Sequence, residues 1–303
     1  MLSTRLKALR FAWLLAAVAC PAAQAIDLAT ETQSIEQWRT GRIGKLTSET
    51  GWLTLVGLYW LDPGENTFGR DAKNKLVLKS PALAERAGAF ILKSQQVSFI
   101  AQPEGGVTLN GQKVTTLDLV PDNQKGATIL SSGSLRFFVI ERGGKLGVRV
   151  RDVESPLRKN FKGIQYYDID PSWHVTARFE PYTPRRAIKI INILGMEDLM
   201  DCPGAIVFTQ GGKEYRLDAV LEEPDDTELF VMFSDGTSGR ETYGAGRFMY
   251  IPMPVDNKVE VDFNKAYNPP CAFNDFATCP LPPQQNRLKV RVEAGEKKYG
   301  AHG

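Results

Sequence analysis

The chain has 303 residues, of which 43% are hydrophobic and 24% charged, with 37 lysines and arginines against 35 aspartates and glutamates. This is the composition of a folded protein, long enough for one large or two ordinary domains. It contains no basic run of the kind that holds phosphates, which excludes nucleic acid as a partner.

The first 25 residues predict export. A basic segment ending at Arg10 precedes a short apolar stretch, Phe11–Cys20, and Ala23-Gln24-Ala25 supplies the small-x-small pattern that signal peptidase reads. The apolar stretch is too short for a permanent span, which needs about 20 residues. We expect a cleaved signal peptide over residues 1–25 and a periplasmic or secreted protein starting near Ile26. The alternative is a lipoprotein attached through Cys20, because Ala17-Val18-Ala19-Cys20 is a degenerate lipobox.

Cleavage would change the charge of the chain. Residues 1–25 carry three basic side chains and no acidic one. The remaining 278 residues therefore hold 34 basic and 35 acidic side chains, a net charge of −1. No transmembrane segment is expected in this mature chain, since no later apolar run reaches the required length.

One helix is predicted directly after the signal peptide. Ile35, Trp38, Arg42 and Leu46 follow the 3.6-residue period, which favours an amphipathic helix over Thr32–Thr47. The apolar run Trp52–Leu61 then predicts a strand, and its aromatic side chains are expected to fill a core.

Short strands separated by turn signals follow up to residue 152. They are expected at Lys75–Lys79, Ala89–Lys93, Gln96–Ala101, Val107–Leu109, Leu135–Glu141 and Leu146–Arg151. Many short strands at this spacing are typical of a sandwich or barrel.

A second β-rich stretch is predicted beyond the connecting segment Asp152–Pro171. Its strands are expected at Trp173–Glu180, Ala187–Ile193, Ala205–Thr209, Lys213–Leu221, Glu228–Ser234, Gly246–Ile251, Val259–Asp262 and Arg287–Val292. The predicted fold class is all-β: an N-terminal helix over 26–50, a β-sandwich over 51–152, and a second antiparallel sheet or barrel-like domain over 153–303.

Three cysteines remain after residue 25. Cys271 and Cys279 bracket a short turn-rich segment, and an oxidising compartment permits a bridge between them, which leaves Cys202 as a free thiol. Pairing with Cys202 is the alternative. The cysteine spacing fits no zinc template.

The first β region resembles a forkhead-associated (FHA) domain. Asn66-Thr-Phe-Gly69-Arg70 is similar to that family's early Gly-Arg, and Val107-Thr-Leu-Asn110-Gly111 to its Asn-Gly. Where the family has a Ser-x-x-His pattern for phosphothreonine, this chain has Glu85-Arg-Ala-Gly88, whose carboxylate would repel a phosphate. Only the sandwich topology is therefore expected to carry over.

From Gly51 onward the sequence resembles a bacterial family catalogued as domain of unknown function 1684. Three segments carry the resemblance: Gly51–Leu58 (GWLTLVGL), Asp235–Arg247 (DGTSGRETYGAGR), and Asp262–Phe273 (DFNKAYNPPCAF) followed by Ala277-Thr-Cys-Pro280. The resemblance implies no particular reaction, cofactor or catalytic residue.

Few groups are available for catalysis. His174 and His302 are the two histidines, so a multi-histidine metal site is excluded and any histidine-dependent mechanism would use His174. His174 lies in an alternating strand, where a hydrogen-bonded structural role is the simpler interpretation. The familiar hydrolase, zinc-protease and nucleotide-binding motifs are absent, and no cofactor or metal is expected.

The glycine-rich segment Asp235–Arg247 is the first candidate site. Glycines let backbone N–H groups approach a ligand, and Arg240 and Arg247 match carboxylate or phosphate, with Tyr243 beside them. The competing interpretation is a tight hairpin whose arginines pair with nearby carboxylates.

The second candidate site is Asp262–Asn268. Asp262 and Asn264 would orient a ligand and Tyr267 would stack on it, although turn chemistry also explains these residues. Together the segments predict an exported protein that binds a small molecule, peptide or glycan. The alternatives are a metal-independent hydrolase of envelope material with Asp235 and Asp262 as a carboxylate pair, and a structural module without a site.

Overall fold

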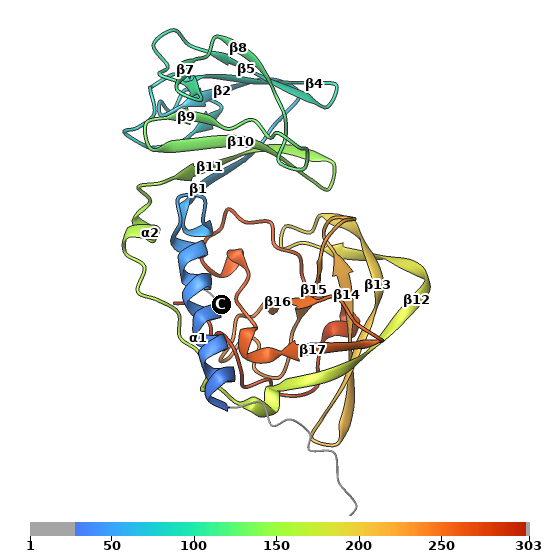
Figure 1. Cartoon of the computed structure of the whole chain (residues 1–303). Helices are drawn as coiled ribbons and strands as arrows, with labels where there is room; N and C mark the ends of the chain where they lie inside the picture. The colour runs from blue at the N-terminus through green and yellow to red at the C-terminus, as the bar shows by residue number, and fades with distance from the viewer. Residues whose placement is uncertain (1–27, 301–303) are drawn as a thin grey trace, which may run out of the picture.

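The computed structural model describes residues 28–300. The predicted signal peptide, its cleavage site, Cys20 and His302 lie outside the described residues. Figure 1 shows two β-rich bodies, with a single long helix lying along the C-terminal body and leading into the N-terminal one. The predicted fold class is confirmed.

The long helix, α1, covers Leu28–Thr47 and begins four residues before the predicted start. Ile35 and Leu46 of the predicted apolar stripe are buried, at 0% and 1% exposure. The turn after the helix requires glycine at position 51, because a Cβ there would clash with the carbonyl oxygen of Leu46. A 3-10 turn, η1 (Trp52–Thr54), then leads into the first strand.

The N-terminal body is a sandwich of two sheets. One sheet has the order β1-β11-β10-β9-β6-β7 and the other β3-β2-β4-β5-β8. The strands are β1 (Leu55–Trp60), β2 (Gly64–Gly69), β3 (Leu76–Val77), β4 (Gly88–Lys93), β5 (Gln96–Ala101), β6 (Thr108–Leu109), β7 (Gln112–Lys113), β8 (Thr116–Leu119), β9 (Leu130–Ser132), β10 (Leu135–Arg142) and β11 (Lys145–Asp152). The strands β2, β7, β8 and β9 were not predicted: β2, β7 and β9 lack apolar alternation, and the alternation of β8 is only four residues long.

Four phenylalanine rings fill the centre of the sandwich. Phe68 lies 5.5 Å from Phe90 and 5.3 Å from Phe137 between ring centroids, and Phe90 lies 4.8 Å from Phe99. Strand β11 points Val148 and Val150 into this core. Successive side chains of a strand alternate between faces, so Arg149 and Arg151 point out of the sandwich.

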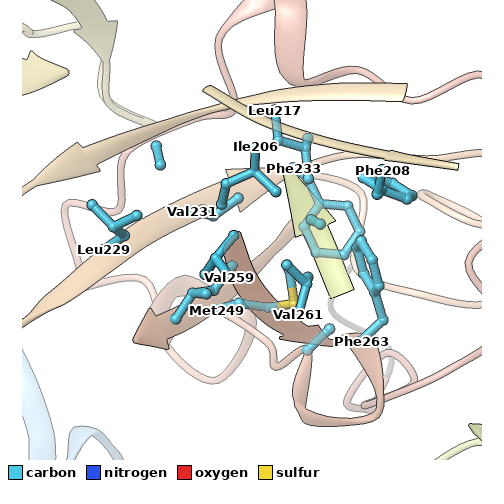
Figure 2. Packing of buried hydrophobic residues seen from close by; sticks show 14 of the residues in the cluster. Ile206, Phe208, Leu217, Leu229, Val231, Phe233, Met249, Val259, Val261 and Phe263 are labelled. Carbon is cyan, nitrogen blue, oxygen red and sulfur yellow. The ribbon is translucent and has the colours of Figure 1, made fainter. Parts of the chain in front are cut away.

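The C-terminal body contains the short helix α2 (Pro156–Lys159) and one six-stranded sheet of order β16-β15-β14-β13-β12-β17. The elements are η2 (Pro171–Trp173), β12 (His174–Ile191), β13 (Glu197–Gln210), β14 (Lys213–Leu221), β15 (Glu228–Phe233), β16 (Arg247–Pro252), β17 (Lys258–Asp262), η3 (Phe263–Lys265), η4 (Pro270–Ala272) and η5 (Gln284–Asn286). The sheet is barrel-like, because all six strands contribute side chains to one buried cluster. Figure 2 shows that Phe233 and Phe263 meet inside it, opposite Met249 and Val259.

The outer face of this sheet is also apolar where α1 covers it. In β15, Leu229, Val231 and Phe233 point into the barrel-like core, whereas Phe230 and Met232 join a second cluster with Leu46 of α1. Burial on both faces explains the continuous apolar run Leu229–Phe233. Two backbone hydrogen bonds of 2.9 Å between Phe248 and Tyr267 tie the segment after β17 to the edge strand β16.

Two predictions about strands were wrong. The strands expected at Trp173–Glu180 and Ala187–Ile193 are a single strand, β12, whose pairing with β13 shifts register between Pro181 and Arg186. The strand expected at Arg287–Val292 does not form a ladder: Arg287 makes an isolated bridge to Ser234, and Leu288 and Val290 each make one backbone hydrogen bond, to Ser234 and Gly236 respectively. The backbone N–H of Val292 bonds instead to the side chain of Asp235, at 2.7 Å, so it does not join a ladder.

Candidate functional site: a cavity between the helix and the two β bodies

The structure buries the charged pair at the ends of the glycine-rich segment. Asp235 Oδ1 lies 3.2 Å from Arg247 Nη2, and both side chains are 0% exposed. Arg247 also donates to the carbonyl oxygens of Val292, at 2.8 Å, and Ala294. The pair therefore fastens the segment around residues 292–294 to the sheet.

Two other candidate residues of that segment, Arg240 and Tyr243, differ in exposure. Tyr243 is buried and its hydroxyl donates to the carbonyl oxygen of Cys271 at 3.2 Å, whereas Arg240 is exposed. The segment Asp235–Arg247 thus packs against the C-terminal body and does not form an open binding loop.

Asp262 and Asn264 form a second cluster, which includes His174. Asp262 Oδ1 accepts from the backbone N–H and from the side-chain amide of Asn264, both at 3.0 Å, and so caps η3. His174 pairs with Asp262 in the register of β12 and β17, and its Nδ1 lies 2.8 Å from Glu31 Oε1 of α1. Among residues 28–300, no hydrogen bond or ion pair joins Asp235 to Asp262.

Tyr267 is the predicted site residue that lines the main cavity. We call this space the junction cavity; its volume is about 630 Å³, within the range of roughly 300–1,000 Å³ of ligand pockets. Its walls come from α1, from β10 and β11 of the sandwich, and from the outer face of β15 and β16 with the segment Tyr267–Pro280. It is lined by six aromatic side chains: Trp38, Trp52, Phe230, Phe248, Tyr250 and Tyr267.

The aromatic wall is held in shape by ring contacts. Tyr250 and Tyr267 stack with their centroids 6.2 Å apart and their planes 18° from parallel. Phe230 and Phe248 meet edge to face at 4.9 Å and 83°. Burial raises the pKa of both tyrosine hydroxyls, so they stay protonated near neutral pH. Trp52, expected in a core, lines this cavity.

Four cationic side chains and one carboxylate also line the junction cavity: Arg42, Lys45, Arg142, Arg149 and Glu222. Arg42 is paired with Glu296 at 3.0 Å and lies 4.6 Å above the ring of Tyr267. Arg142 holds Asp122 with two hydrogen bonds of 2.8 and 2.9 Å.

Arg149 differs from these arginines. It is 2% exposed, and its Nη2 donates to Thr278 Oγ1 at 3.1 Å. Burial lowers its pKa to about 10, helped by the charge of Arg142, so the guanidinium remains positive near pH 7.

Of the residues predicted to bind a ligand, Tyr267 lines this cavity, and the cationic side chains of the cavity were not predicted. Trp38 and Arg42 stand in the apolar stripe predicted for α1, and an arginine in such a stripe is the visible signal of a buried polar contact. Arg149 was missed, because alternation places it on the outer face of β11 without showing that the C-terminal body covers that face.

The predicted Cys271–Cys279 disulfide is not formed. Cys202, Cys271 and Cys279 are all free and buried. Cys279 Sγ accepts the backbone N–H of Cys271 at 3.1 Å, so the two residues are neighbours without a covalent bond. A hydrogen bond from the Cys279 thiol lowers the pKa of Cys271, while burial raises that of Cys279.

Within residues 28–300, no group of three or more histidines, cysteines and carboxylates is arranged to hold a metal ion. In the same part of the chain no helix is both long and apolar enough to cross a membrane.

Fold and site together define a β-rich protein in which a sandwich, a barrel-like sheet and a helix enclose an aromatic and cationic cavity. Residues 159–297 match the family described as "Protein of unknown function (DUF1684)", and this part of the chain belongs to it. The match contains the segments around Asp235–Arg247 and Asp262–Phe273 and does not extend to Gly51–Leu58.

Comparisons with other proteins add no activity. No curated protein matches the sequence. An uncharacterized protein of Haloarcula marismortui, solved by solution NMR, is 31% identical over 46% of this chain and 78% of its own, with a TM-score of 0.40. The FHA domain of FhaA, solved with the intracellular domain of Rv3910, is 19% identical over 31% of this chain and 86% of its own, with a TM-score of 0.22. A second FHA structure, from a study of phosphothreonine-dependent interactions, is 19% identical over 31% of this chain and 81% of its own, also with a TM-score of 0.22.

Proposed function

We propose that this protein is an exported ligand-binding protein and that its ligand is a small molecule held in the junction cavity. The observation that carries the proposal is the cavity itself, about 630 Å³ in volume, where side chains from α1, the sandwich and the barrel-like sheet converge. Ligand sites occur preferentially at such junctions, and an apolar lining with a few polar groups is typical of them. Export rests on the pattern of residues 1–25.

The geometry supports binding better than hydrolysis. The side chain of Asp235 is committed to a buried ion pair with Arg247 and to the backbone of Val292. In Asp262, Oδ1 caps η3 and Oδ2 lies 3.2 Å from the ammonium group of Lys265. A general acid or base needs a free proton position facing the substrate, and neither carboxylate lines the junction cavity.

Two glycines of α1 provide a matched test of binding in the cavity. Gly41 lines it and Gly44 does not, and a Cβ at either position would meet no atom within 4 Å. Gly41→Trp should place an indole ring in the cavity, while Gly44→Trp places the same side chain on the same helix outside it. A metabolite library is screened by thermal shift, since a ligand at 100 times its Kd stabilises the folded state by about 2.7 kcal/mol.

We expect compounds that raise the melting temperature of the wild type and of Gly44→Trp but not of Gly41→Trp. Equal shifts in all three proteins would place the binding elsewhere and refute the proposal. Export is tested separately by cell fractionation and by sequencing the mature N-terminus, which should be Ile26. A full-length chain retained in the cytoplasm would refute that part.

A further inference from the structure

Arg149 is a buried cation without a carboxylate partner. The other buried arginine, Arg247, has Asp235, but within residues 28–300 Arg149 takes part in no salt bridge. Its Nε is buried without a hydrogen-bond partner, and its Nη2 has the hydroxyl of Thr278. A buried charge is costly unless it is paired, so this guanidinium needs an anion.

The charged side chains that line the cavity, taken with their partners, carry a net charge of one positive unit. Of the four lining cations, Arg42 and Arg142 are neutralised by the carboxylates of Glu296 and Asp122. Arg149 and Lys45 remain, and Glu222 is the single lining carboxylate. Four cations against three carboxylates give an excess of one positive charge, which a monoanion balances and a dianion would exceed.

The surroundings of Arg149 favour a ligand with an apolar body. The guanidinium carbon lies 5.7 Å from the centre of the Trp52 ring, and the stacked pair of Tyr250 and Tyr267 belongs to the same cavity. Flat aromatic walls bury ring systems well, and a guanidinium fork matches the two oxygens of a carboxylate.

We propose that the ligand of the junction cavity is a monocarboxylate with an apolar, ring-containing body, and that Arg149 binds its carboxylate. This inference rests on the proposed function, since it names the chemical class of ligand for the same cavity. Arg149 is then the residue that selects charge, while the aromatic wall provides most of the buried contact area.

The test compares two probes of equal shape, 2-naphthoate and 2-naphthamide, by isothermal titration calorimetry on the wild-type protein. We expect 2-naphthoate to bind at least tenfold more tightly, because only the carboxylate forms charge-assisted hydrogen bonds with the guanidinium. The dianion 2-naphthyl phosphate should bind more weakly than 2-naphthoate. Two equally tight probes, or a preference for the phosphate, would overturn the inference.

Two arginine variants assign the preference to Arg149. Arg149→Met should abolish the difference between 2-naphthoate and 2-naphthamide, and Arg149→Lys should keep part of it. Arg151→Met is the matched control, since Arg151 points out of the same face of β11 but does not line the cavity. If Arg149→Met keeps the preference for the carboxylate, the inference is wrong.

Failure of this inference is distinguishable from failure of the proposed function. Probes that bind equally to the wild type and to Arg149→Met, but are excluded by Gly41→Trp, would leave the cavity as the site and remove only its charge selectivity. Probes that bind neither the wild type nor the control Gly44→Trp, together with no stabilising compound in the thermal-shift screen, would remove both.

Discussion

Replacing Arg149 with methionine should stabilise the protein. Burial lowers the pKa of this arginine from its ordinary value of 12.5 to about 10. At about 1.4 kcal/mol per pKa unit, holding the charge inside the folded protein costs about 3 kcal/mol at neutral pH. Methionine has a similar reach, no charge, and a flexible chain that fills irregular space.

The substitution also removes two favourable contacts. The hydrogen bond from Nη2 to Thr278 contributes about 1 kcal/mol, and the contact with the Trp52 ring, at 5.7 Å, contributes about 0.5–1 kcal/mol. The net expectation for Arg149→Met is an increase of about 1–2 kcal/mol in the free energy of unfolding. The residue would thus reduce stability in order to serve binding.

Urea denaturation measures this change, followed by far-UV circular dichroism and by tryptophan fluorescence. Coincident transitions establish two-state unfolding, and an increased midpoint at an unchanged slope isolates a change in stability. A decrease of more than 1 kcal/mol would refute the reasoning, because it would show that the guanidinium anchors the two β bodies together. Without stabilisation, the energetic basis of the ligand inference is also lost.

Two further predictions concern buried groups of the C-terminal body. Asp235→Ala should lower the free energy of unfolding by about 3–5 kcal/mol in urea denaturation, because it leaves the charge of Arg247 buried and unpaired. Its control Glu241→Ala breaks the exposed pair with Arg291 and should have a much smaller effect; equal losses would contradict this account. Burial raises the pKa of Cys202 from 9.0 to about 12, so between these pH values the unfolded chain releases the thiol proton while the folded protein retains it, and stability falls as pH rises. Cys202→Ala should reduce that fall in denaturation series at pH 8 to 11, and identical slopes for both proteins would contradict the prediction.

The sequence predicted the class of the fold because local patterns express it. Alternation along Lys213–Leu221 and Gln96–Ala101 predicted those two strands with their observed limits. Strands such as Gly64–Gly69 were missed, since their pairing comes from neighbours distant in sequence and not from their own pattern. The strand at Arg287–Val292 was wrong for a similar reason: its backbone bonds to Ser234 and Gly236 end at Val290, and Val292 donates to the side chain of Asp235, contacts that its own pattern does not express.

The candidate site was harder to predict, because it is assembled from three parts of the chain. The glycine-rich segment was predicted to bind a ligand because of its arginines, yet Arg247 is buried beside Asp235 and binds the protein's own backbone. Tyr267 was named among the candidates and lines the junction cavity, whereas its neighbours there, Arg42 and Arg149, stand in elements that the sequence predicted as structural. Proximity of residues more than 100 positions apart is a property of packing that one sequence does not display.

The ion pair between Arg42 and Glu296 joins residues 254 positions apart, and the helix that carries Arg42 forms one wall of the junction cavity. The two side chains can pair only when both ends of the chain are present in the compartment where the protein folds, so this wall of the cavity forms late in folding. In a refolding experiment, the recovery of ligand binding should therefore follow the recovery of secondary structure.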